Sequence, residues 1–132
     1  MTPDGKIIYA VDFDGTISLG KWPETGDPNI ELIKYLIRQR VKNGNKVILN
    51  TNRSGDLLEK AVRFCRAYGL EFDAVNENLP EMIEAYGNDS RKISADHYID
   101  DRAERPDEHD WGYLNIHGRD IKRRGENDEN KE

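Results

Sequence analysis

The sequence predicts an α/β fold in which a parallel β-sheet carries helices on both of its faces. Short apolar runs rich in β-forming residues alternate along the chain with longer segments whose apolar residues recur at helical spacing. The first of these runs is almost continuously apolar, as expected of a strand that is buried on both faces. The length of 132 residues suits a single domain.

Four segments are expected to form the strands of this sheet. Each is short, and a turn residue or a carboxylate follows most of them. They are residues 6–11 (KIIYAV), 46–50 (KVILN), 71–75 (EFDAV) and 95–99 (ADHYI), with residues 111–116 (WGYLNI) as a candidate fifth strand.

The helix expected after the first strand has clear boundary signals. Asp27 is predicted to be its N-cap, with Pro28 in the first turn. Apolar residues then recur at helical spacing over residues 30–41, and Gly44 is a suitable stop. A loop precedes this helix, with too few residues for an inserted cap domain.

Two further helices are expected, over residues 54–69 and 79–87, each ending at a glycine. The predicted domain therefore covers residues 1–116. Residues 117–132 are polar, with few apolar side chains, and are predicted to form a flexible tail.

Composition excludes several classes of function. The formal net charge of −6 argues against nonspecific nucleic-acid binding and against binding to an anionic membrane surface. No apolar run reaches the roughly 20 residues of a membrane span, and the N-terminus does not resemble a signal peptide. The single cysteine, Cys65, is expected to be a packed thiol, so a reducing, cytoplasmic location is predicted.

Carboxylates and a hydroxyl follow three of the expected strands. Asp12 and Asp14 come after the first strand, Thr51 after the second, and Asp100 and Asp101 after the fourth. Ligands bind beyond the carboxyl ends of the strands in open parallel sheets, so these groups are expected to converge. Four neighbouring carboxylates repel one another unless a cation binds them, and hard oxygen ligands favour Mg²⁺ over Zn²⁺.

Three segments together resemble the motifs of the haloacid dehalogenase (HAD) superfamily. They are VDFDGTI (residues 11–17), VILNTNR (residues 47–53) and SRKISADHYIDDR (residues 90–102). The first is specific, whereas the others are informative because they occur in this order. The resemblance covers residues 6–116 and is to small, capless members, which implies a Rossmann-like sheet and a Mg²⁺-dependent phosphatase activity.

The resemblance also implies a role for each matching residue. Asp12 would attack phosphorus and form an aspartyl-phosphate, and Asp14 would act as the general acid and base. Thr51 would hydrogen-bond the phosphoryl oxygens. Lys92 would neutralise the phosphoryl group, with its neighbour Arg91 as the alternative basic residue.

The same resemblance assigns the metal ligands. Asp100 would bind Mg²⁺ together with Asp12 and the backbone carbonyl of Asp14. Asp101 would either bind the ion through water or orient its ligands.

Three residues outside these roles are candidates for contact with substrate. Asn52 and Arg53 follow Thr51 and are placed to reach the mouth of the site, although Arg53 could equally be a surface arginine. Trp22, in the loop before the first helix, would either cover the site or pack as a lid.

Two alternatives to hydrolysis of a general phosphomonoester stay open. A noncatalytic phosphoacceptor or regulatory module would keep the same acidic Mg²⁺ pocket. A polynucleotide-end phosphatase would need a basic track, and the only basic cluster, residues 122–124, is surrounded by acidic residues. The phosphorylated substrate cannot be read from the sequence, and without a cap the site could take a large molecule or be walled by a second copy of the chain.

Overall fold

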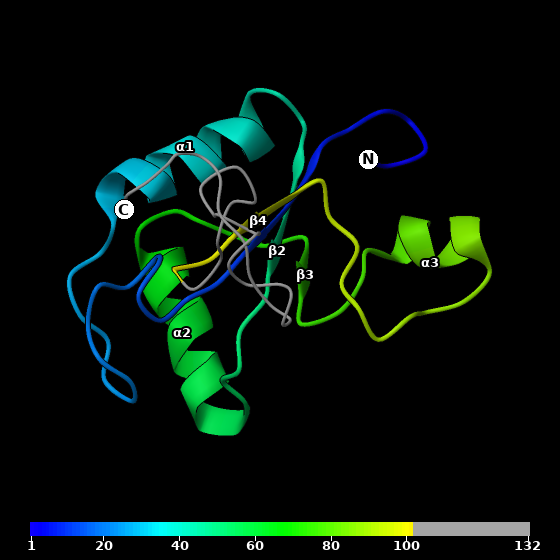
Figure 1. Ribbon diagram of the computed structural model, residues 1–132. Helices are drawn as coiled ribbons and strands as arrows, with labels where there is room; N and C mark the ends of the chain where they lie inside the picture. Colours follow the sequence, from blue (N-terminus) through cyan, green and yellow to red (C-terminus); the bar gives the residue numbers. More distant parts are fainter. Residues whose placement is uncertain (102–132) are drawn as a thin grey trace, which may run out of the picture. The chain divides into compact units, whose positions relative to one another are not determined.

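The computed structural model describes residues 1–101, so the expected strand at 111–116 and the tail at 117–132 lie outside it. Helices and strands alternate as predicted (Figure 1). The elements are β1 (Ile8–Val11), α1 (Ile30–Val41), β2 (Lys46–Leu49), α2 (Gly55–Ala67), β3 (Ala74–Val75), α3 (Pro80–Tyr86) and β4 (His97–Ile99). Among these residues, no helix is both long and apolar enough to cross a membrane.

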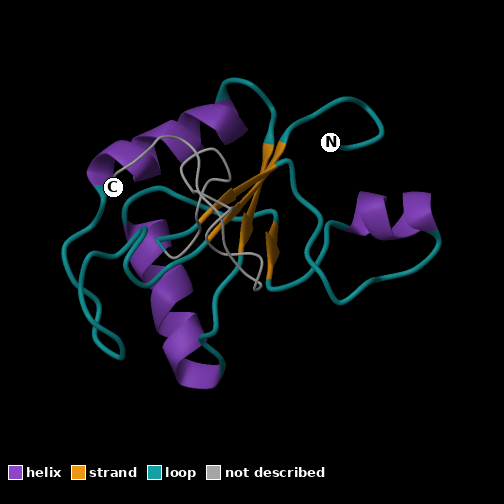
Figure 2. Ribbon diagram, viewed as in Figure 1, coloured by secondary structure: helices purple, strands orange, loops and turns teal. Residues whose placement is uncertain are grey.

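The four strands form one parallel sheet in the order β3-β2-β1-β4 (Figure 2). In the register of β1 with its two neighbours, Val11 lies opposite Leu49 of β2 and Ile99 of β4. The chain therefore leaves β1, β2 and β4 at the same edge of the sheet. The predicted α/β class and parallel sheet are confirmed.

The two faces of the sheet are covered by different helices. Tyr9 and Val11 of β1 belong to a core cluster that also contains residues of α1 and α2. Ile8, which points to the opposite face because side chains alternate along a strand, packs in a second cluster with Met82 of α3. Figure 1 shows α1 and α2 on one side of the sheet and α3 on the other. The prediction of helices on both faces is confirmed.

The start of α1 differs from the sequence-based prediction. Asn29, and not Asp27, is the N-cap, and its side chain accepts a hydrogen bond from the Leu32 N–H. Asp27 and Pro28 precede the helix. The carbonyl of Asp27 accepts from the Leu19 N–H, and Pro28 forms an antiparallel bridge with Ser18. The predicted cap was wrong because these two residues pair with an earlier segment, a long-range contact that helix-boundary signals do not contain.

The strands are shorter than predicted, most of all at their beginnings. β4 begins at His97, and the preceding Asp96 contacts β1 through its side chain, which accepts from the Ile8 N–H at 2.8 Å. β3 has only two residues, and Asp73 before it likewise accepts from the Val47 N–H at 2.8 Å. A carboxylate thus satisfies the backbone donor where the parallel ladder begins.

Cys65, a residue of α2, is fully buried in the core cluster between this helix and the sheet, as predicted for a packed thiol. Burial raises the pKa of the thiol to about 12, because the apolar surroundings disfavour the thiolate. A thiol held neutral in this way is a poor nucleophile. Cys65 is therefore a structural residue.

Candidate functional site

The candidate site begins where the chain leaves the central strand β1. The N–H of Asp12 donates to the Ile99 carbonyl of β4 at 2.9 Å, and the Asn50 N–H donates to the Val11 carbonyl at 2.8 Å. These bonds continue the ladder one step beyond the strands. They place Asp12 between the ends of β2 and β4, which is the edge expected for ligand binding in a parallel sheet.

The three aspartates whose carboxylates are predicted to serve the metal come together at this edge. Asp12, Asp100 and Asp101 each offer one carboxylate oxygen, and these oxygens all lie within 4.8 Å of one another. Asp12 is half-buried, whereas Asp100 and Asp101 are exposed. Hard carboxylate oxygens are the ligands that Mg²⁺ takes in proteins, so the donor set fits the ion that the sequence predicts.

The turn after Asp12 lets Asp101 approach this cluster. Gly15 has a φ of +80°, and a Cβ at this position would collide with the carboxylate of Asp101. The Asp101 N–H also donates to the Thr16 hydroxyl at 3.1 Å. The glycine of the DFDGT motif thus allows the backbone angle of the turn, and its missing Cβ leaves the space that the Asp101 carboxylate occupies.

The electrostatic surroundings of Asp12 are unfavourable for its charge. Burial and then the carboxylates of Asp100, Asp101 and Asp14 raise the pKa of Asp12 to about 6, and a backbone hydrogen bond from Phe13 opposes this rise. Among residues 1–101, the nearby charges that act on Asp12 are all negative, like its own. A cation bound between the carboxylates would remove the repulsion and favour the ionised form.

Asp14 lies in a different environment, paired with Arg53. The guanidinium donates from Nε to Asp14 Oδ2 at 2.9 Å and from Nη2 to Oδ1 at 2.8 Å, which is a bidentate ion pair. The sequence interpretation placed Arg53 at the mouth of the site or on the surface. In the structure its residue exposure is only 3 %, and its guanidinium lies 4.8 Å from the centre of the Phe13 ring.

The loop that carries Thr51 is held by an asparagine that sequence reasoning missed. The side chain of Asn76 accepts from the Thr51 N–H at 2.8 Å, and Asn76 has a positive φ of 56°. The Thr51 hydroxyl accepts from the Arg53 N–H at 3.1 Å, and Asn52 is exposed. The available signal was an asparagine directly after a predicted strand, since asparagine tolerates the left-handed region.

The basic residues expected at the site lie on the segment between α3 and β4. Both Arg91 and Lys92 are exposed, and within residues 1–101 no ion pair joins the Lys92 ammonium to Asp12. The segment is anchored by buried Asn78, whose side chain donates to the Lys92 carbonyl and accepts from the Ser94 N–H. The structure therefore brings neither basic side chain into an ion pair with the predicted nucleophile.

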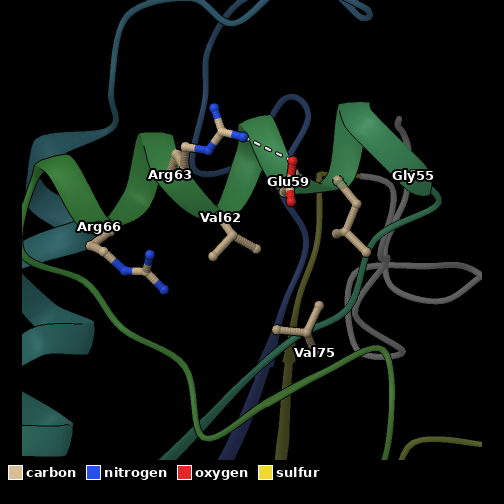
Figure 3. A pocket seen from close by; sticks show the side chains of 7 residues that line it. Gly55, Glu59, Val62, Arg63, Arg66 and Val75 are labelled. Atoms are coloured by element: carbon tan, nitrogen blue, oxygen red, sulfur yellow. Dashed lines mark hydrogen bonds and ion pairs between the residues drawn. The ribbon is translucent and has the colours of Figure 1, made fainter.

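A cavity of about 400 Å³ lies away from the carboxylates, between α2 and β3 (Figure 3). Apolar and charged side chains line it together, and Arg63 at its rim pairs with Glu59 at 2.8 Å. The lining residues are Gly55, Leu58, Glu59, Val62, Arg63, Arg66 and Val75. None of them belongs to the predicted site, so this cavity and the acidic cluster are separate features.

Comparison with known proteins identifies a related protein but assigns no activity. No protein-family model matches the chain, and no curated protein matches it. One solved structure, of a conserved protein from Bacteroides thetaiotaomicron, is 40% identical and superposes with a TM-score of 0.65. The match covers 75% of this chain and 78% of that one. The chain therefore belongs to the same family as this conserved Bacteroides protein, and its chemistry must be argued from the site.

Proposed function

We propose that the protein is a Mg²⁺-dependent phosphomonoester hydrolase of the HAD type, which acts through an aspartyl-phosphate on Asp12. The observation that carries the proposal is the convergence of Asp12 with Asp100 and Asp101 at the carboxyl ends of β1 and β4, with oxygens within 4.8 Å of one another. The order of the three motifs along the chain supports the same reading. The substrate is a phosphomonoester whose alcohol portion is not specified by these residues.

Two displacements at phosphorus make up the proposed reaction. In the first, a carboxylate oxygen of Asp12 attacks phosphorus, the bond to the leaving oxygen breaks, and Asp14 gives that oxygen a proton. In the second, Asp14 takes a proton from water as the water oxygen attacks phosphorus, and the bond to Asp12 breaks. Inorganic phosphate leaves, and both aspartates return to their starting state.

Asp12, Asp100 and the backbone carbonyl of Asp14 would hold Mg²⁺, with Asp101 binding through water or orienting the other ligands. Bound there, the ion would supply the positive charge that phosphoryl transfer chiefly requires. The raised pKa of Asp12, about 6 without a cation, supports a site that is completed by one. The Thr51 hydroxyl and the Asn52 side chain would bind phosphoryl oxygens, and Lys92 or Arg91 would add charge once the segment that carries them approaches.

A noncatalytic phosphoacceptor is the second candidate, and one observation favours it. Both carboxylate oxygens of Asp14 accept hydrogen bonds from Arg53. An acid–base group held in this way would leave an aspartyl-phosphate on Asp12 without a free base to activate water. This module would be phosphorylated at Asp12 and would not turn over. No described contact favours a polynucleotide-end phosphatase. Salt-sensitive binding of an oligonucleotide would be the observation that supports this function.

The proposed location is the cytoplasm. Cys65 is buried and, as the single cysteine of the sequence, cannot form an intramolecular disulfide, which is compatible with a reducing compartment.

Hydrolysis of p-nitrophenyl phosphate with Mg²⁺ and with EDTA tests the proposal directly. We expect turnover that needs Mg²⁺ and that Asp12→Asn reduces by at least about 10³-fold. Glu59→Gln, which removes an exposed carboxylate on α2, is the matched control and should keep full activity. Full activity in Asp12→Asn would end the nucleophile assignment, and a stable aspartyl-phosphate in the wild type without turnover would favour the phosphoacceptor.

A further inference from the structure

We infer that Arg53 is a positioning residue that couples the flap, residues 18–28, to the carboxylate of Asp14. The role of Asp14 as the acid–base group rests on the proposed function, whereas the coupling of flap and carboxylate does not. It differs from the substrate contact that the sequence suggests for Arg53. The inference follows from the hydrogen bonds of one buried guanidinium.

That guanidinium joins Asp14 and the flap, which both lie about 30 to 40 residues before it, to the first turn of α2. Besides its two bonds to Asp14, Arg53 donates from Nη2 to the flap carbonyls of Pro23 at 3.1 Å and Glu24 at 3.3 Å. Its Nη1 donates to the Leu57 carbonyl, in the first turn of α2, at 3.1 Å. Each nitrogen of the guanidinium therefore has an acceptor, and two of the acceptors are backbone atoms of the flap.

Burial makes these contacts depend on one another. The Arg53 side chain is 0% exposed, whereas that of Asp14 is 27% exposed. Water cannot readily replace an acceptor that a fully buried donor loses, so losing either the flap carbonyls or the carboxylate is costly. The position of the flap and the orientation of Asp14 are thus linked through one charge.

Other described contacts of the flap lie mainly at its base. The Leu19 N–H donates to the Asp27 carbonyl at 2.8 Å, and the Gly26 N–H donates to the Ser18 hydroxyl at 2.9 Å. Near the tip, Trp22 is 62% exposed, and within residues 1–101 the Glu24 carboxylate forms only a long, exposed ion pair with Lys60 at 3.9 Å. Exposed pairs of this kind contribute little. Arg53 is accordingly the strongest described anchor of the flap beyond its base.

The coupling has a consequence for the proposed reaction. Asp14 cannot give a proton to a leaving group while both of its oxygens accept from Arg53, so it must turn away from the guanidinium. A substrate that moves the flap also moves acceptors of the same guanidinium. Contact between substrate and flap would therefore change how firmly the guanidinium holds Asp14.

Limited proteolysis measures the coupling without any assay of activity. Trypsin can cut after exposed Lys21 in the flap and after exposed Lys34 in α1, and mass spectrometry distinguishes the two cuts. Local opening of the flap speeds only the first cut, whereas global unfolding speeds both. The readout is therefore the ratio of the two rates.

We expect Arg53→Met to raise this ratio by at least about fivefold, and Asp14→Asn, which keeps the guanidinium but removes one acceptor oxygen, by about threefold. Arg53→Lys should lie between the wild type and Arg53→Met. The matched control is Arg63→Met, which removes an exposed arginine of α2 and should leave the ratio unchanged. If Arg53→Met does not fold, Asp14→Asn decides; an unchanged ratio in folded Asp14→Asn overturns the coupling.

Kinetics separates a positioning role from a substrate contact. For Arg53→Lys we expect kcat to fall by about tenfold or more while KM stays within about threefold. An Arg53→Lys variant that keeps kcat and raises KM by more than about tenfold would overturn the inference in favour of direct binding. If the wild type hydrolyses nothing, the proposed function fails, and the proteolysis ratio still decides whether Arg53 couples the flap to Asp14.

Discussion

Asp12 and Asp14 lie two residues apart, yet the structure gives their carboxylates opposite surroundings. Asp12 is surrounded by Asp100, Asp101 and Asp14, and burial with these like charges raises its pKa to about 6. Asp14 is neutralised by the bidentate guanidinium of Arg53, whose side chain is fully buried. Within residues 1–101, the charges that act on the first carboxylate are all negative, whereas the second is paired with a fully buried guanidinium.

This difference separates a group of carboxylates that can bind an ion from an ion pair that stabilises the fold. A cluster of carboxylates without compensation is a suitable place for a divalent ion, because the ion replaces repulsion with attraction. A buried and fully hydrogen-bonded pair instead holds structure in place, and breaking it leaves an uncompensated charge.

Removing the charge that compensates Asp14 should have the largest effect on stability. Arg53→Met is expected to lower the free energy of unfolding by about 3–5 kcal/mol, since it leaves Asp14 without its partner and removes the Arg53 hydrogen bonds to three backbone carbonyls. Urea denaturation measures the loss. Arg63→Met, at an exposed i,i+4 pair, should cost less than about 0.5 kcal/mol. A loss below about 1 kcal/mol in Arg53→Met would mean that the pair is not structural.

Supplying the charge that Asp12 lacks should stabilise the fold. Mg²⁺ at 100 times its dissociation constant is expected to raise the free energy of unfolding by about 2.7 kcal/mol. Asp100→Asn should lose most of this gain, whereas Glu59→Gln, outside the cluster, should keep it. Denaturation with MgCl₂, against NaCl at equal ionic strength, measures the gain. An equal Mg²⁺ effect in Asp100→Asn would place the ion elsewhere.

The approach of Asp101 to the turn can be tested by adding one carbon atom. Gly15→Ala should lower the free energy of unfolding by about 1–2 kcal/mol for its positive φ alone, with a further loss from collision with Asp101. Gly5→Ala is the matched control, because Gly5 has a φ of +85° and its added Cβ would meet nothing within 4 Å. Equal losses in the two variants, measured by thermal denaturation without metal, would contradict a further loss and show that the Asp101 carboxylate turns away from the added Cβ at no measurable cost.

The pH dependence of stability without metal reports on Asp12 itself. The pKa of Asp12 in the folded protein is raised from 3.8 to about 6, so the folded state favours the protonated carboxyl. The resulting contribution to the free energy of unfolding is fully present below about pH 4 and is lost as the pH rises through 6. Its partial exposure screens the effect, so we expect a loss of about 1 kcal/mol. Asp12→Asn should lack this loss and be the more stable form at pH 7.5 without Mg²⁺. Parallel stability curves for the two proteins between pH 4 and 7.5 would contradict the raised pKa.

Much of the fold was readable from local patterns. Apolar runs identified four strands, and helical spacing with terminal glycines identified three helices. The motif order placed carboxylates after β1 and β4, and the parallel pairing of these strands brings Asp12 together with Asp100 and Asp101. These features were predictable because strand direction alone decides which edge of a parallel sheet a residue reaches.

The sequence by itself therefore determined the α/β alternation, the acidic edge of the sheet and the packed position of Cys65. Only the tertiary structure decided that Arg53 turns inward to Asp14, that Asn76 holds the Thr51 loop, and that Asn29 caps α1. The physical reason is the range of the interactions. Hydrophobic periodicity and strand ends are set by neighbours along the chain, whereas the partner of a charged or amide side chain is whichever donor or acceptor the folded chain brings within hydrogen-bond distance of it.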